Sequence, residues 1–130
     1  MNKAENSKKY DLEERCLKFA KNVREYTKKL PRTTSNFEYT KQLIRSSGSV
    51  GANYIEANES LSRKDFFMRV RICRKEVKES EYWLSLTEPD DNNQGSRNDL
   101  VRESVELRKI FGAIVEKSRV TAWGCLIFGV

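Results

Sequence analysis

Apolar and small residues recur at every third or fourth position along most of the chain. One such run comprises Leu12, Cys16, Phe19, Val23, Tyr26 and Leu30, and another comprises Phe66, Val70, Cys73, Val77, Ser80, Leu84 and Thr87. This spacing places a single stripe on one side of a helix, and the stripe is stable in water only when it packs against other helices. We therefore expect an all-α protein, an antiparallel up-down-up-down four-helix bundle.

Turn-forming residues between these runs set the expected boundaries. The helices are predicted at about residues 10–29, 35–58, 63–87 and 98–119, with a polar, frayed N-terminus at 1–9 and an apolar tail at 120–130. Pro31 ends the first helix, because the residue before a proline is pushed out of helical geometry. A stretch of turn formers at 88–96 separates the last two helices. Because the first connection is short, the first two helices are expected to be antiparallel.

The second predicted helix contains a run of small residues between Ser46 and Gly51. Glycine and serine are poor helix formers, but their small side chains allow a neighbouring backbone to come close. We interpret the run as a site of tight helix packing. The alternative, a phosphate-binding loop, is rejected because the Gly-Lys-Ser/Thr ending of such loops is absent.

Charge is distributed unevenly along the 130 residues, whose formal net charge is +6. Residues 63–78 carry seven bases and two acids, whereas residues 79–99 carry one base and six acids. The bases of interest in the third helix are Lys64, Arg71, Arg74, Lys75 and Lys78. Their spacing places four of them on one face, with Arg74 beside it. Two interpretations stay open: a surface that binds nucleic acid or another polyanion, and an ordinary solvated helix face.

Catalytic and metal-binding signatures are missing from the sequence. It contains no histidine, which excludes Ser-His and Cys-His catalytic pairs and the Glu-x-x-His ligands of di-iron bundles. Five acids are of the type that holds Mg²⁺: Glu76, Glu79, Glu81, Asp90 and Asp91. Because bases interleave with them, we interpret these acids as part of a solvated face. We therefore expect a protein that is not an enzyme and holds no metal or other cofactor.

The three cysteines are odd in number and widely spaced, so they imply no disulfide framework and favour a reducing compartment. The N-terminus lacks the apolar core of a signal peptide, and the tail at 120–130 is too short to span a bilayer. We therefore expect a cytoplasmic protein with no membrane partner. A second apolar edge on the third helix, together with the apolar tail, predicts self-association.

A longer pattern runs through the middle of the chain. It begins with Leu30-Pro31, continues as Gln42-Leu43-x-Arg45-Ser46-Ser47-x-Ser49-Val50-x-Ala52-Asn53-x-x-Glu56, and ends with Ser62-x-x-Asp65-Phe66 and Arg74-Lys75-Glu76-x-Lys78-Glu79-x-x-Tyr82-Trp83-Leu84. In these positions the chain resembles the four-helix-bundle proteins encoded in intervening sequences of bacterial 23S rRNA genes, over roughly residues 10–118. One departure is Ala57, where that family usually has glycine at the end of the second helix.

The resemblance implies a bundle that assembles as a homo-oligomer, a five-fold ring. The biochemical function of that family is not established, but a related branch consists of accessory proteins of diversity-generating retroelements, which bind RNA and a reverse transcriptase. Five polar residues of the shared pattern are expected to form a buried network that fixes the bundle or a subunit contact: Gln42, Arg45, Ser49, Asn53 and Glu56.

These observations lead to two main hypotheses about function, and an enzyme such as a metal-dependent nuclease that needs Glu79 is a third. The first is a non-enzymatic, oligomeric bundle associated with RNA, in which the bases of the third helix form a polyanion-binding surface. The second is a protein-interaction scaffold or accessory subunit without nucleic-acid binding. In that case the same bases meet an acidic partner, or the acidic 79–99 segment of a neighbouring copy.

Overall fold

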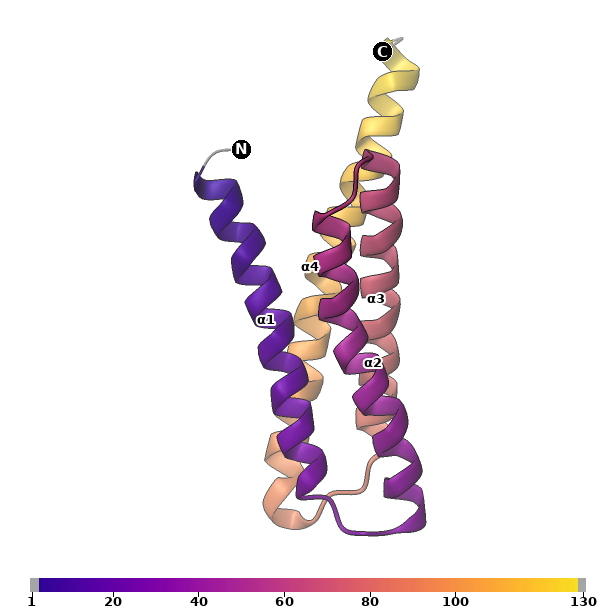
Figure 1. Cartoon of the computed structure of the whole chain (residues 1–130). Coiled ribbons are helices and arrows are strands. Elements are labelled where there is room, and N and C mark those ends of the chain that lie inside the picture. The colour runs from indigo at the N-terminus through magenta and orange to yellow at the C-terminus, as the bar shows by residue number, and fades with distance from the viewer. Residues whose placement is uncertain (1–2, 129–130) are drawn as a thin grey trace.

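The computed structural model describes the backbone of residues 3–128 and the side chains of residues 11–119. Within that range four long helices run antiparallel, with no strand between them (Figure 1). They are α1 (Lys3–Lys28), α2 (Thr34–Asn58), α3 (Arg63–Leu86) and α4 (Gln94–Phe128), and a short 3₁₀ turn, η1 (Asp91–Asn93), precedes α4. The predicted all-α, up-down-up-down bundle is confirmed.

The first and last helices, α1 and α4, are longer than the pattern of apolar residues predicts. Helix α1 begins at Lys3, within the segment that was expected to fray, and α4 continues through the expected tail to Phe128. No proline interrupts either extension, and the only glycine in them, Gly124, lowers helix stability by about 1 kcal/mol without ending a helix. The side chains of residues 120–130 lie outside the described part of the chain.

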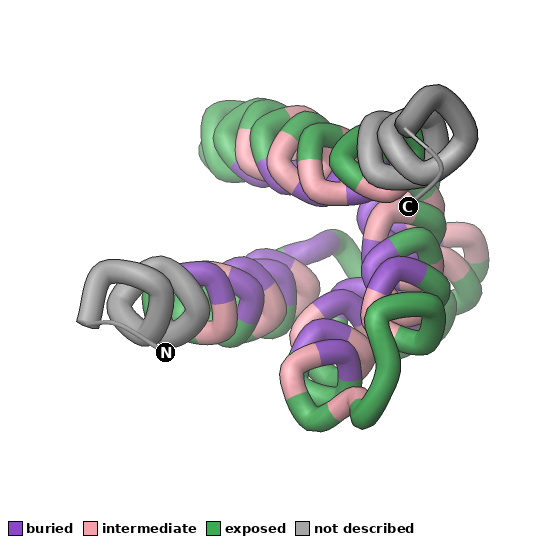
Figure 2. The backbone as a smooth tube through the Cα atoms, turned by 90° about the horizontal axis from the view of Figure 1, so that it is seen from above, coloured by how far each residue is buried: buried purple, intermediate pink, exposed green. Residues whose placement is uncertain are grey.

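The predicted apolar stripes form the core. All six residues of the first stripe are buried, as are Val70, Cys73, Val77 and Leu84 of the stripe on α3. Figure 2 shows these buried positions turned toward the interior of the bundle. One position of the α3 stripe differs by one residue, because Phe67 is buried whereas Phe66 is only half-buried. On α4, likewise, Val115 is buried whereas the adjacent Ile114 is only half-buried. Phe66 and Ile114 line a groove at one end of the bundle, so the neighbouring helices cover them only in part.

Helices approach each other closely at part of the run of small residues on α2. A side-chain carbon on Gly51 of α2 would stand 3.2 Å from Cβ of Cys16 on α1. The hydroxyl of Ser80 on α3 donates to that of Ser46 on α2 at 2.9 Å, and both residues are fully buried. Gly48, in contrast, faces open space. Helix packing therefore explains the small residues at positions 46 and 51, but it does not explain Gly48.

Buried polar residues join the connections at the closed end of the bundle, where the α1–α2 and α3–α4 connections meet. Asn36 is 2% exposed, and its amide nitrogen donates to the carbonyl oxygens of Pro31 and Glu88, both at 3.0 Å. Its amide oxygen accepts the backbone N–H of Glu88 at 2.9 Å. Nearby, the hydroxyls of Tyr26 and Thr87 lie 2.7 Å apart. These hydrogen bonds hold α1, α2 and α3 together at one end.

The opposite end is open. Helix α1 packs mainly against α2 and only lightly against α4, and toward its N-terminus it diverges from the other helices (Figure 1). A bidentate pair, from Arg15 Nε and Nη2 to the carboxylate of Glu103 at 2.8 and 2.7 Å, is the main link between α1 and α4. A groove lined by residues of all four helices lies at this end.

Candidate nucleic-acid interface

Four bases of α3 lie in one row on the outer surface of the bundle. Lys64, Arg71, Lys75 and Lys78, which we call the basic row, are all exposed, and they occupy the side of α3 opposite its buried residues. The row spans 14 residues, or about 21 Å at 1.5 Å per residue. The four bases therefore share one exposed face of α3.

Two arginines connect this surface with α4. Arg71 Nη2 donates to Ser118 Oγ at 3.1 Å. Arg74 is half-buried, and its side chain passes over Gly112, where an added Cβ would stand 4.0 Å from the arginine Cδ. Arg74 therefore contributes its charge at the α3–α4 seam, beside the basic row.

Acidic residues on the α2 side of α3 are held by an arginine of α2. Arg45 Nη2 lies 2.6 Å from Glu79 Oε2, and Arg45 Nη1 donates to the buried Glu76 at 3.4 Å. Trp83 Nε1 also donates to Glu79, at 3.3 Å. The hydrogen bond from Arg45 is the main cause that lowers the pKa of Glu79 below its ordinary value. We call Arg45, Glu76 and Glu79 the α2–α3 clasp.

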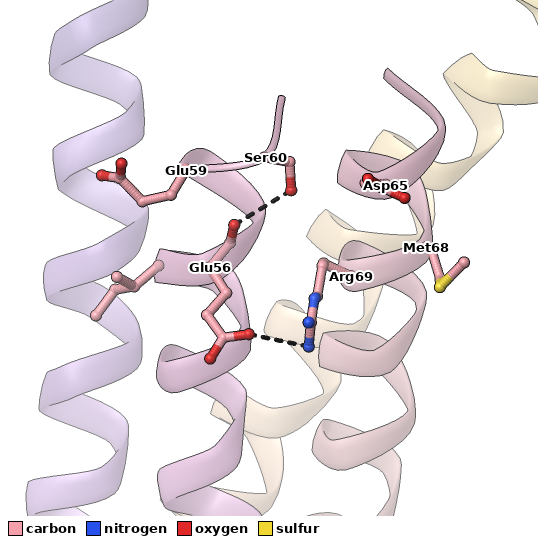
Figure 3. Close-up of a pocket in the computed structure, with 7 residues that line it drawn as sticks. Glu56, Glu59, Ser60, Asp65, Met68 and Arg69 are labelled. Carbon is pink, nitrogen blue, oxygen red and sulfur yellow. Dashed lines mark hydrogen bonds and ion pairs between the residues drawn. The ribbon is translucent and has the colours of Figure 1, made fainter. Parts of the chain in front are cut away.

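Two further ion pairs link the flanks of α3 to its neighbouring helices. Arg69 on α3 contacts Glu56 on α2 at 3.0 Å (Figure 3), and Arg108 on α4 lies 3.4 Å from Glu81. The basic row itself forms no ion pair with any of residues 11–119. Glu76, Glu79 and Glu81 of α3 are thus paired with arginines of neighbouring helices, while the basic row remains available to an external anion.

An aromatic residue extends the row. Tyr82 lies one turn beyond Lys78 on the same face of α3, and it is 57% exposed. Its ring meets that of Trp83 edge-on with centroids 5.1 Å apart, and Trp83 in turn lies against Tyr39 of α2 at 6.2 Å. Trp83 is therefore a packing residue, whereas Tyr82 presents a ring to solvent.

The five polar residues of α2 do not form one buried network. Arg45 belongs to the α2–α3 clasp, and Asn53 and Glu56 both contact Arg69, the first with its amide oxygen 3.4 Å from Nη1. Ser49 contributes only its carbonyl oxygen, which accepts from Asn53 at 2.9 Å, and Gln42 is exposed and forms no hydrogen bond with residues 11–119. These positions flank the core stripe of α2, so they lie along the surface of the α2–α3 seam. Sequence analysis missed their partners on α3, Arg69 and Glu76.

A small pocket lies between the end of α2 and the start of α3, with a volume of about 430 Å³ (Figure 3). Its lining includes three acids, Glu56, Glu59 and Asp65, but Glu56 is already paired with Arg69. No cluster of three or more metal-ligating side chains occurs in the described part of the chain. The five acids considered as Mg²⁺ ligands are not brought together, because Glu76 and Glu79 bind Arg45 whereas Glu81 faces Arg108.

Comparison with known proteins assigns the chain to a family. The model of the 23S rRNA-intervening sequence protein family matches residues 8–112. The chain belongs to this family. Among solved structures, this 23S rRNA-intervening sequence protein resembles a protein of unknown function from the S23 ribosomal protein family of Bacteroides thetaiotaomicron. The two are 31% identical with a TM-score of 0.71, and the similarity covers 80% of this chain and 97% of the other.

No curated protein matches the chain. The family and its solved member confirm the resemblance and the fold, and neither assigns an activity. Within residues 3–128, moreover, no helix combines the length and apolar character needed to cross a bilayer.

Proposed function

We propose that this protein is a non-enzymatic, oligomeric RNA-associated bundle whose basic row contacts the phosphate backbone. The observation that carries the proposal is the division of charge on α3, where Glu76, Glu79 and Glu81 are paired with arginines of α2 and α4 whereas the basic row forms no ion pair with residues 11–119. A solvated helix face typically intersperses acids with bases, as the i,i+3 pairs Lys41–Glu38 and Lys109–Glu106 do here. The basic row does not follow that pattern.

Single-stranded or looped RNA fits this surface better than a long duplex. A convex helix carrying a row of bases about 21 Å long follows one backbone, and the exposed ring of Tyr82 at its end is placed to stack on an unpaired base. Such stacking contributes about 1–3 kcal/mol per base and tolerates any base type. The recognition that we propose therefore depends on charge and shape, with little sequence preference.

Oligomerisation would multiply the surface. Three large apolar residues of α2, Phe37, Ile44 and Ile55, are 41–63% exposed, and their spacing of 7 and 11 places them in one line with the unobstructed Gly48. A line of exposed apolar residues with a glycine in the middle suits close contact with a helix of another copy. The five-fold ring that we expect from the family would carry five basic rows. Light scattering or native mass spectrometry of the purified protein tests the subunit number.

RNA binding is tested by fluorescence anisotropy with a labelled hairpin RNA that has a single-stranded loop, titrated at several KCl concentrations. With four phosphates neutralised, log K is expected to fall against log salt with a slope of about −3. Replacing the four residues of the basic row by glutamine should abolish most of the affinity and flatten the slope. The matched control replaces four exposed bases of the α1 region, Lys18, Lys21, Lys29 and Arg32, and loses the same formal charge.

The proposal fails if the two quadruple variants lose affinity equally, because binding would then reflect net charge alone. A finer comparison uses Tyr82→Ala and Tyr82→Phe. The alanine variant should bind more weakly, whereas the phenylalanine variant keeps the ring and should bind like the natural protein.

A protein-interaction scaffold is the second candidate. The connection between α3 and α4 exposes Glu88, Asp90 and Asp91, which provide a complementary acidic surface on another copy. Charge reversal at Arg71 and Lys75 separates the two candidates. Loss of RNA binding with assembly intact supports the RNA-associated bundle, whereas loss of assembly supports the scaffold.

A further inference from the structure

The open end of the bundle contains an apolar groove that the basic row does not use. All four helices and the α2–α3 turn contribute to it, and its volume is about 1000 Å³. Its floor consists of Tyr54, Ala57, Phe66, Phe67, Ile110 and Ile114. We call it the end groove. It lies where α1 diverges from the other helices (Figure 1).

The end groove is the place where the core is least covered. Five hydrophobic residues pack against the core while remaining partly exposed, and three of them, Phe66, Ile110 and Ile114, line this groove. Its lining also includes charged residues, among them Asp11 and Arg15. An apolar floor with charged residues around it is the arrangement of a protein-docking surface.

The chain contains a segment whose chemistry matches the groove. Residues 120–130 form its longest stretch without a charged residue, and six of the eleven are large and apolar: Val120, Trp123, Leu126, Ile127, Phe128 and Val130. The segment lies beyond the part of the chain that matches the family, residues 8–112. Its role is therefore not supplied by what the family shares.

The segment at residues 120–130 does not reach the end groove of its own chain. Helix α4 is continuous from Gln94 to Phe128, so it carries the segment past the α2–α3 turn and away from the bundle (Figure 1). The length of the segment nevertheless matches the length of the groove. The α4 wall of the groove, Ile110 to Lys117, runs about 10 Å along the helix, and Val120 to Phe128 runs about 12 Å.

We propose that residues 120–130 of one copy occupy the end groove of a second copy, and that the exchange is reciprocal. Groove and segment lie at the same end of the molecule, so a single two-fold axis beyond that end places each segment in the other copy's groove. The two α4 helices then run antiparallel. This contact is independent of RNA binding, and it doubles whatever assembly the helical bodies form by themselves.

The first test compares the mass in solution of the full chain with that of a chain ending at Arg119. Sedimentation velocity over a wide range of protomer concentrations should give the full chain twice the subunit number of the truncated chain. The ratio does not depend on the subunit number of the body, so it separates this contact from the ring of the proposed function. Equal subunit numbers would overturn the proposal. Circular dichroism verifies that the truncated chain is folded.

The second test uses the full chain and does not rely on truncation. Leu61 lines the end groove in the α2–α3 turn and is fully exposed, so Leu61→Cys leaves the core intact. A tagged Leu61→Cys, Cys125→Ser chain is mixed with the natural chain, whose cysteines other than Cys125 are buried, and treated with a short bismaleimide. Because the thiols at positions 61 and 125 are on different chains, a product of both masses reports contact between copies.

Its matched control is Leu17→Cys, Cys125→Ser, because Leu17 is also an exposed leucine but lies on α1 outside the end groove. Strong cross-linking at position 61 and weak cross-linking at position 17 supports the proposal. Equal yields at the two positions, or no product at position 61, contradict it even if the full chain self-associates.

Discussion

Replacing Asn36 by alanine should destabilise the bundle more than any other change to a single polar side chain at its closed end. The side chain is almost fully buried and forms three hydrogen bonds at 2.9–3.0 Å, to Pro31 and to both backbone groups of Glu88. Each such bond contributes about 0.5–1.5 kcal/mol net. Because Pro31 and Glu88 are exposed, water can reach their backbone groups in part. We therefore expect a loss of about 2–3 kcal/mol in the free energy of unfolding.

The assay is urea unfolding followed by circular dichroism at 222 nm, at one fixed protomer concentration because assembly contributes to apparent stability. An unchanged m-value with a lower midpoint indicates that stability alone changed. Thr33→Ala is the control, since Thr33 is exposed and caps α2 through one bond to Asn36 N at 3.1 Å. Loss of that cap should cost about 1 kcal/mol. If Asn36→Ala costs no more than Thr33→Ala, the two connections are not joined as the structure indicates.

Three further predictions follow from the interior and surface of the bundle. At a protomer concentration too low for assembly, Gly48→Ala should raise the free energy of unfolding by about 1 kcal/mol, because alanine has the higher helix propensity and nothing lies within 4 Å of its added Cβ. Gly51→Ala should raise that free energy less or lower it, because its Cβ would press on Cys16, and urea unfolding of the two variants measures the difference. Arg45 lowers the pKa of Glu79, so the clasp is fully stabilising above the ordinary glutamate pKa and weakens as the pH falls through the lowered value. The stability lost in Glu79→Gln, about 0.5–1 kcal/mol at pH 7, should therefore shrink by pH 3, and a pH-independent difference would contradict this account. Burial raises the pKa of Cys16 and Cys73 to about 12, so a Cys125→Ser chain should release no colour from Ellman's reagent at pH 8 until urea unfolds it, and then react at two thiols.

Sequence periodicity was sufficient for the fold because the core of a helical bundle is a local property of each helix. Phe19 and Val23 are spaced to share one face of α1, and Leu43 belongs to the corresponding face of α2, whatever residues these faces pack against. The structure buries all three. The row of bases on α3 could be predicted for the same reason, because a helix face depends only on spacing. The helix ends were predicted less well, because the extensions of α1 and α4 have no strong apolar pattern and no breaker.

Contacts between helices could not be read from the spacing of any single helix. The sequence by itself determined an all-α bundle, the apolar stripes of its first and third helices and the uneven charge of the third helix. Only the tertiary structure decided that Arg45 and Arg69 pair with acids across the α2–α3 seam, and that Asn36 joins the α1–α2 connection to Glu88, 52 residues further along the chain. It also decided that a groove lies at the end where α1 diverges. Which side chains form ion pairs, and which end of the bundle is open, depends on how the helices are rotated and tilted relative to one another. That arrangement is set by all contacts between the helices rather than by the residue pattern of a single helix.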